Sequence, residues 1–206
     1  MSQGTGPIVE YLARSRDVVA AALGDQRLIQ TIAAVVDRVA AALDAGRKVL
    51  LAGNGGSAGD AQHIAGELVG RFLYDRAPAA AIALTTDSSV LTAIANDYGY
   101  DAVFERQVQG LGRPGDILIV LSTSGRSPSI LKAIEAARAG GLFVIGFTGQ
   151  GGGDMVSRCD LCLCAPADST PLIQQLHITF GHIVCELVEE RLFPRAATPP
   201  LAAIAD

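Results

Sequence analysis

The sequence predicts an α/β fold: a doubly wound, five-stranded parallel sheet flanked by helices, with an N-terminal helical hairpin. Segments with the apolar spacing of helices alternate along the chain with short strands. The strands are almost entirely apolar, which indicates a parallel sheet covered on both faces. The composition agrees, because half of the residues are hydrophobic while aromatic residues make up only 5% and Trp is absent.

Length and charge narrow the class of protein. The chain has 206 residues, which suits one compact domain. Its net charge is −5 at pH 7 and it has no run of basic residues, so a nucleic-acid partner bound through its phosphates is not expected. The N-terminus lacks a secretory signal pattern, and no uninterrupted apolar stretch reaches the roughly 18 residues of a membrane span. We therefore expect a soluble, cytoplasmic protein with no membrane association.

Two helices open the chain and form the predicted hairpin, which covers residues 8–45. The second helix ends at a glycine stop, Ala45-Gly46. The apolar spacing then changes to that of a strand over 48–53. A helix follows at 57–72, and Ser57 is its predicted N-cap.

Four more strands alternate with helices in the rest of the chain. The strands are predicted at 80–84, 116–121, 142–147 and 160–164. The helices are predicted at 89–95, 102–109 and 129–139, as a short helix after the glycine-rich stretch 149–154, and at 171–192. Thr170 followed by Pro171 predicts the start of the last helix. Residues 1–193 are thus predicted to form a single domain, with a flexible, proline-containing tail at 194–206.

Two polar loops follow predicted strands, at the sheet edge where open α/β sheets bind ligands. The first is 53-GNGGSAGD-60, whose glycines allow a ligand to approach the backbone closely. The second is 122-STSGRS-127, which offers four hydroxyls beside the amides of a helix start. Hydroxyls and helix amides together bind a phosphate ester without a lysine. The alternative is that the serines only cap the next helix and form a turn. Neither loop fits the phosphate-binding pattern of nucleoside triphosphatases.

Two helices carry the residues suited to proton transfer or metal binding. His63 and Glu67 are four residues apart and so share a helix face. Such a pair can supply two metal ligands or an acid/base group with its orienting partner, or it can be simply exposed and solvated. On the last helix, His182 is a further candidate for proton transfer. His177 lies among apolar residues and is expected to belong to the core.

Three of the four cysteines lie close together in 158-RCDLCLCAP-166. The spacing allows a metal site. Cys162 and Cys164 alternate with leucines, however, as in a short buried strand where a free thiol behaves as a small hydrophobe. We favour the strand, and we expect no disulfide in a cytosolic chain.

Four strings of residues carry a resemblance to a known family. They are 53-GNGGSAGDAQHIAGELVGRF-72, 96-NDYGY-100, 122-STSGRS-127 and 169-STPLIQQLHITFGH-182. In this order they resemble the phosphoheptose isomerases of the sugar isomerase (SIS) superfamily, over roughly residues 8–193. The resemblance implies a SIS fold and a homotetramer whose active sites are shared between subunits. It also implies conversion of sedoheptulose 7-phosphate, a small sugar phosphate, to D-glycero-D-manno-heptose 7-phosphate, the first step toward nucleotide-activated heptose.

The resemblance also implies roles for individual residues. One Zn²⁺ per subunit is expected, and Glu67 and His182 match the proposed catalytic acid/base pair. The positions that match zinc ligands are His63, Glu67, Gln174 and His182. The positions that match substrate contacts are Asn54, Gly55, Gly56, Glu67, Asn96, Asp97, Ser122, Thr123, Ser124, Ser127 and Gln174. Leu172 and Arg126 depart from the family pattern, since many relatives have a basic residue and an asparagine there.

The expected chemistry is proton transfer between C1 and C2 of the sugar through an enediol-like intermediate. Glu67 is the predicted base and His182 its partner, and the serine loop is expected to hold the phosphate. Asp97 is expected either to orient sugar hydroxyls or to assist a proton transfer. Gln174 and His182 are eight residues apart, which separates their backbones by roughly 12 Å along one helix. We therefore expect them to reach one ion from different subunits.

Two other functions stay open from the sequence. One is a non-catalytic SIS protein that binds a replication-initiator partner. The presence of both Glu67 and His182 favours an enzyme over this alternative. The other is an isomerase of a pentose or hexose phosphate, because these motifs do not specify the length of the substrate.

Overall fold

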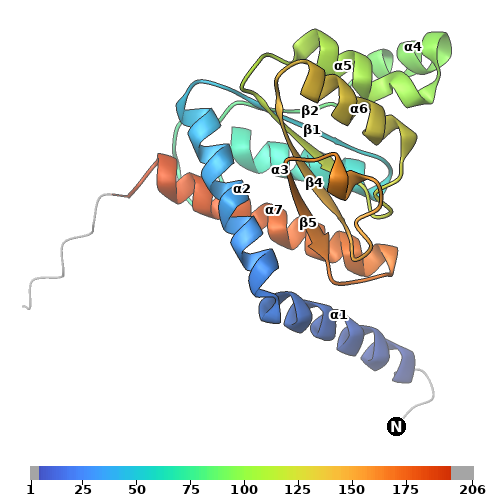
Figure 1. Cartoon of the computed structure of the whole chain (residues 1–206). Coiled ribbons are helices and arrows are strands. Elements are labelled where there is room, and N and C mark those ends of the chain that lie inside the picture. The colour runs from blue at the N-terminus through green and yellow to red at the C-terminus, as the bar shows by residue number, and fades with distance from the viewer. Residues whose placement is uncertain (1–4, 196–206) are drawn as a thin grey trace, which may run out of the picture.

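A computed structural model describes residues 5–195 and shows one parallel sheet of five strands (Figure 1). The strand order is β2-β1-β3-β4-β5, and every neighbouring pair is parallel. The strands are β1 Val49–Gly53, β2 Ala81–Ala83, β3 Ile117–Leu121, β4 Phe143–Gly149 and β5 Leu161–Ala165. The predicted α/β fold with a doubly wound parallel sheet is confirmed.

Helices cover both faces of this sheet, as the apolar strands predict. Every residue of β1 and β3 is buried. One core lies between the sheet and α2, α3 and α7, and the other between the sheet and α5 and α6. The helices are α1 Gly6–Gly24, α2 Gln26–Asp44, α3 Gly56–Val69, α4 Ser88–Tyr98, α5 Val103–Leu111, α6 Pro128–Ala139 and α7 Thr170–Leu192, with short 3₁₀ helices η1 Tyr100–Ala102 and η2 Met155–Ser157.

The two N-terminal helices are present, but they do not fold back on each other as a hairpin. Their axes meet at 76°, and α1 projects away from the sheet (Figure 1). Asp25 separates them: its backbone is extended, and its side chain accepts a hydrogen bond from the amide of Leu28, which caps α2. Because a capped helix starts afresh at Asp25, the chain changes direction there.

No single helix in the described part of the chain is long and apolar enough to cross a membrane. By length and composition alone, α1 and α2 pass that test only as a pair, across their bend.

Two predicted helix starts are wrong by one or two residues. Gly55, with a φ of +56°, holds the N-cap position of α3, while Ser57 lies inside the first turn and is 3% exposed. A glycine takes this left-handed φ without strain, so the chain turns earlier than a serine cap would require. The last helix has Ser169 at its N-cap position and not Thr170.

The helix predicted to reach residue 72 ends at Val69, followed by Gly70.

The C-terminal end of the chain leaves part of the predicted domain organisation untested. Of the predicted tail at 194–206, residues 196–206 lie outside the described residues. The boundary of a single domain at residue 193 stays a prediction.

Candidate active site

The two polar loops meet at the point where the strand order reverses. β1 pairs with β2 on one side and with β3 on the other, so the loops after β1 and β3 leave the same edge of the sheet next to each other. This is the position at which open α/β sheets form their ligand crevice.

Asn54 joins the two loops through its side chain. Its amide group donates hydrogen bonds of 3.0 Å to the hydroxyls of both Ser127 and Ser129. Its carbonyl oxygen accepts a 2.8 Å hydrogen bond from the hydroxyl of Tyr100. Asn54 therefore fixes the glycine-rich loop against the serine loop and against η1.

The capping alternative does not account for Ser127. Ser127 occupies the N-cap position of α6, but its side chain makes no capping hydrogen bond. Its hydroxyl instead contacts Asn54 and, at 3.3 Å, the hydroxyl of Ser129. The serine is thus part of a polar network between the loops. In the first turn of α6, Pro128 has no N–H and the amides of Ile130 and Leu131 donate to the carbonyl oxygen of Ser127, so the hydroxyls are the main donors that this loop offers to a ligand.

The serine loop is held in place by the loop after β4. Gly125 has a φ of +63°, and a Cβ at this position would lie 2.3 Å from the carbonyl oxygen of Gly152. The carbonyl oxygen of Gly125 accepts hydrogen bonds from the amides of Asp154 and Met155, at 3.0 and 3.2 Å. Only glycine fits here, because any side chain would push the two loops apart.

A cleft of about 420 Å³ opens beside the serine loop. Thr123, Ser124 and Arg126 line one wall, and residues 149–153 line another. Ser122 is 7% exposed, whereas Ser124 and Arg126 are exposed. Arg126 adds a positive charge to the wall that carries the hydroxyls, which suits an anion on that side, while Asp168 lines the cleft as its one carboxylate among the described residues.

His63, Glu67 and His182 form a compact group on two neighbouring helices. The Nε2 atoms of His63 and His182 are 2.9 Å apart, and Nε2 of His63 lies 3.2 Å from Oε1 of Glu67. One potential ligand atom from each residue lies within 4.8 Å of the other two. The side chains of His63 and Glu67 are 48% and 25% exposed, so the group is open to a ligand.

Close packing of α3 against α7 brings this group together. Gly181 makes the approach possible, because a Cβ there would lie 2.6 Å from Cδ1 of Ile64. The glycine is one residue from His182, and Ile64 is next to His63. A larger side chain at position 181 would therefore separate the two histidines.

A buried ion pair holds the end of α3 beside α7. Glu189 accepts hydrogen bonds from the amides of Phe72 and Leu73, at 2.8 and 2.7 Å, and from Nε of Arg76 at 3.0 Å. Arg76 also donates to the carbonyl oxygen of Glu67 at 2.8 Å. The side chains of Arg76 and Glu189 are 3% and 1% exposed. This pair fixes the backbone that carries Glu67.

The structure does not bring every predicted site residue into one group. The Gln174 side chain lies against Gly56 at the start of α3, where its Nε2 atom is 2.3 Å from the position a Cβ would take. Gln174 is two turns before His182 on α7, so it lies away from the histidine group of its own chain. Asn96 donates a 2.8 Å hydrogen bond to Asp97, and both are exposed on α4.

Reasoning from the sequence missed four residues that shape the site. Tyr100, Ser129, Arg76 and Glu189 make the contacts described above. Tyr100 lies within the recognised string 96-NDYGY-100, which is a signal that pointed to it. His177 is fully buried in the core, as expected, and burial lowers its pKa to about 4, so it is neutral at pH 7.

Comparisons with known proteins agree on one family. Residues 10–149 match the family model for the SIS domain. The chain is 55% identical to the phosphoheptose isomerase of Burkholderia pseudomallei, over 90% of this chain and 94% of that protein. It is 49% identical to the phosphoheptose isomerase of Aneurinibacillus thermoaerophilus, with the same two coverages.

Solved structures give the same result. The phosphoheptose isomerase of Neisseria gonorrhoeae superposes with a TM-score of 0.84 at 38% identity, covering 89% of this chain and 97% of that one. The phosphoheptose isomerase of Francisella tularensis superposes with a TM-score of 0.88 at 34% identity, covering 92% of this chain and 100% of that one.

Proposed function

The chain belongs to the SIS domain family and, within it, to the phosphoheptose isomerases, and on this premise we propose that it converts sedoheptulose 7-phosphate to D-glycero-D-manno-heptose 7-phosphate. This is an aldose–ketose isomerisation and the first step of nucleotide-activated heptose biosynthesis. The single observation that carries the proposal is the group of His63, Glu67 and His182 on α3 and α7, because α3 begins at the loop that Asn54 ties to the serine loop. A carboxylate and imidazoles at one end and an anion cradle at the other suit a phosphorylated sugar.

The phosphate end of the substrate is assigned to the serine loop. Ser122, Thr123, Ser124 and Ser127 offer hydroxyls, and the amides at the start of α6 add their dipole. Binding energy from this remote group positions the reacting carbons, which is how it contributes to turnover. Asn54, Gly55 and Gly56 are assigned to the sugar chain, together with Asn96 and Asp97.

The reacting end is assigned to Glu67 and His182. Glu67 removes a proton from one of the two reacting carbons and returns it to the other, which forms and then consumes the enediol. His182 moves a proton between the two oxygens. The two side chains come from α3 and α7, whose packing is fixed by Gly181 and by the Arg76–Glu189 pair.

The same group suits a zinc ion. Two imidazole nitrogens and one carboxylate oxygen within 4.8 Å of one another match the nitrogen and oxygen ligands that Zn²⁺ takes in proteins. His63, Glu67 and His182 would hold the ion, and zinc bound there would polarise the carbonyl oxygen of the substrate. Three ligands from one chain leave coordination positions for a ligand from a second subunit and for the substrate, since catalytic zinc can expand to five ligands.

Gln174 is assigned as the fourth ligand and as a substrate contact, from a second subunit. Its position against Gly56 keeps it away from the zinc ligands of its own chain. A homotetramer whose active sites are shared between subunits satisfies this geometry. We assign the enzyme to the cytoplasm. The apolar residues exposed on α1 suit such an assembly, since a monomer would leave them in water: Ile8, Val9, Leu12, Val19 and Leu23.

Product analysis with and without a chelator tests the proposal. We expect turnover of sedoheptulose 7-phosphate, identification of the heptose product by NMR, loss of activity on chelation and recovery with Zn²⁺. Ketose phosphates of five and six carbons serve as matched substrates. Turnover of these alone would identify an isomerase of another sugar phosphate. No turnover of any of the three would favour a non-catalytic binding protein. Full activity after complete metal removal would contradict the zinc assignment.

Replacing Asn54 with alanine is expected to raise KM about tenfold, because the serine loop loses a tether worth roughly 1.4 kcal/mol. The variant removes hydrogen bonds to Ser127, Ser129 and Tyr100. Steady-state kinetics with sedoheptulose 7-phosphate measures the change. Tyr100→Phe is the matched control, since it removes only one of these bonds and is expected to have a smaller effect. An unchanged KM in Asn54→Ala would show that the tether does not organise the site.

A further inference from the structure

Three thiols lie together at the far edge of the sheet, outside the candidate active site. β5 is an edge strand that pairs only with β4. Cys162 and Cys164 belong to β5, and Cys159 precedes it. All three are partly exposed free thiols, in contrast to the buried Cys185 on α7.

The thiols are close to one another. Gly146 of β4 is the register partner of Cys162, and a Cβ there would lie 2.8 Å from Sγ of Cys159 and 3.2 Å from Sγ of Cys162. The two sulfurs are therefore at most 6.0 Å apart, which is the sum of these distances. Cys164 lines the same cleft as these two thiols. Gly146 leaves the space that the sulfurs occupy.

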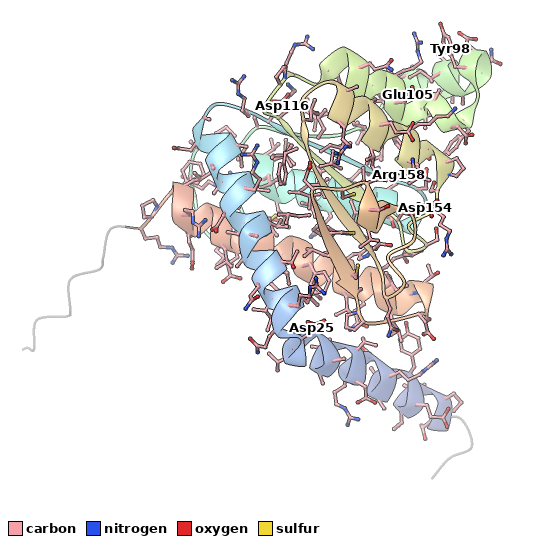
Figure 2. The ribbon with its side chains drawn as sticks, viewed as in Figure 1. Asp25, Tyr98, Glu105, Asp116, Asp154 and Arg158 are labelled. Carbon is pink, nitrogen blue, oxygen red and sulfur yellow. The ribbon has the colours of Figure 1, made fainter. Side chains whose placement is uncertain are left out.

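These thiols open onto a cleft of about 410 Å³ between β5 and the start of α2. Asp25 lies at the junction of α1 and α2 (Figure 2). It lines this cleft together with Asp160 and Arg27. Asp160 is paired with Arg138 at 3.5 Å and the Asp25 side chain caps α2, so both carboxylates already have partners and the thiols are the candidate metal ligands of this cleft. Cys159 and Cys162 also pack against the core, so the strand interpretation made from the sequence holds for their apolar contacts.

The protonation of the thiols is set by their mutual contacts. Hydrogen bonding to Cys159 raises the pKa of Cys162 to about 12. Hydrogen bonding to Cys162 and burial raise the pKa of Cys164 as well. A bound metal ion would replace these protons, so binding must release protons.

We propose that Cys159, Cys162 and Cys164 bind one thiophilic metal ion of the Zn²⁺ and Cd²⁺ group, at a site separate from His63, Glu67 and His182. Zinc-type ions bind thiolates at about 2.3 Å, which brings neighbouring sulfurs to about 3.8 Å from each other in a tetrahedral site. The three sulfurs do not all lie within 4.8 Å of one another as they stand, so the side chains must rotate inward about their Cα–Cβ bonds to bind one ion. Their partial exposure to the cleft gives them room to do so.

Titration of the reduced, full-length protein with Cd²⁺ tests this proposal. Cadmium bound to thiolates gives an ultraviolet charge-transfer band that histidine and carboxylate ligands do not give. We expect a band that saturates at one Cd²⁺ per chain and is accompanied by proton release. Cys162→Ser is expected to abolish the band, and Cys185→Ala, which removes the one thiol outside the group, is expected to retain it.

Two outcomes of the Cd²⁺ titration would overturn the proposed thiol site. Absence of the band in the parent protein, or the same band in Cys162→Ser, would overturn the proposal. If Cys162→Ser does not fold, as judged by circular dichroism, Cys159→Ser takes its place, because Cys159 precedes the strand. That variant is expected to raise the Kd for Cd²⁺ at least about tenfold, and an unchanged Kd would also overturn the proposal.

Discussion

Replacing Glu67 with glutamine is expected to reduce kcat about 100-fold or more, because an amide keeps the shape of the side chain but cannot accept a proton from carbon. Glu67 lies 3.2 Å from His63 and in one group with His182, so its carboxylate is close to two imidazoles suited to move a proton. The measurement is steady-state turnover of sedoheptulose 7-phosphate. Turnover close to that of the parent protein would rule out Glu67 as the base.

Loss of the metal could imitate loss of the base, since Glu67 is also a proposed zinc ligand. Two measurements separate the roles. The metal content of Glu67→Gln is determined after loading with Zn²⁺, and kcat is compared at equal occupancy. His63→Asn is the matched control, because it removes a proposed ligand without removing the proposed base. We expect excess Zn²⁺ to restore activity to His63→Asn and not to Glu67→Gln.

Local sequence patterns predicted most of the fold. Each of the five strands is a short apolar run, and such runs identify buried strands because both faces of a parallel sheet are covered. The position of the polar loops followed from the same reasoning, since the carboxyl ends of parallel strands meet at one edge. Errors at the starts of α3 and α7 were small, because caps depend on the φ and ψ of one residue, which the sequence indicates only weakly.

The rest of the site depended on contacts between distant parts of the chain. Arg76 and Glu189 are separated by 113 residues, and nothing in the local pattern of either pairs them. The bond from Tyr100 to Asn54 also joins different elements. The bend at Asp25 was missed for another reason: two amphipathic helices in succession predict neither a hairpin nor a bend until the surface that packs on α1 is known.

Replacing Glu189 with glutamine is expected to lower the free energy of unfolding by about 3–5 kcal/mol, because it leaves the Arg76 guanidinium buried without its counter-charge. The carboxylate is 1% exposed and accepts bonds from two amides as well as from Arg76. Urea unfolding at pH 7 measures the loss. Glu190→Gln is the matched control, because the carboxylate of Glu190 is next to Glu189 in the sequence but exposed. We expect its free energy of unfolding to change by no more than about 0.5 kcal/mol.

The pH dependence of stability gives an independent check. Burial acts to raise the pKa of Glu189, but the hydrogen bonds from Leu73, Phe72 and Arg76 outweigh it, so the pKa lies below the ordinary value of 4.5. A lowered native pKa contributes stability above the unfolded value and loses it as the pH falls through the native value. The parent protein should therefore lose this contribution below about pH 4.5, whereas Glu189→Gln should lack that loss. If the stability of the parent protein and that of Glu189→Gln fell in parallel as the pH was lowered, the lowered pKa of Glu189 would be contradicted.

Pairing also predicts that the two substitutions are not additive. Arg76→Met alone leaves Glu189 with only its backbone donors, and Glu189→Gln alone leaves a buried cation, so each single variant carries the cost of an unmatched group. Removing both charges removes that cost, and the double variant should lose less stability than the two singles combined. Since Arg76 also binds the carbonyl of Glu67, kcat should fall in Arg76→Met and stay low in the double variant. Recovery of stability without recovery of kcat would show that the ion pair stabilises the fold, whereas the bond from Arg76 to the carbonyl of Glu67 positions the base.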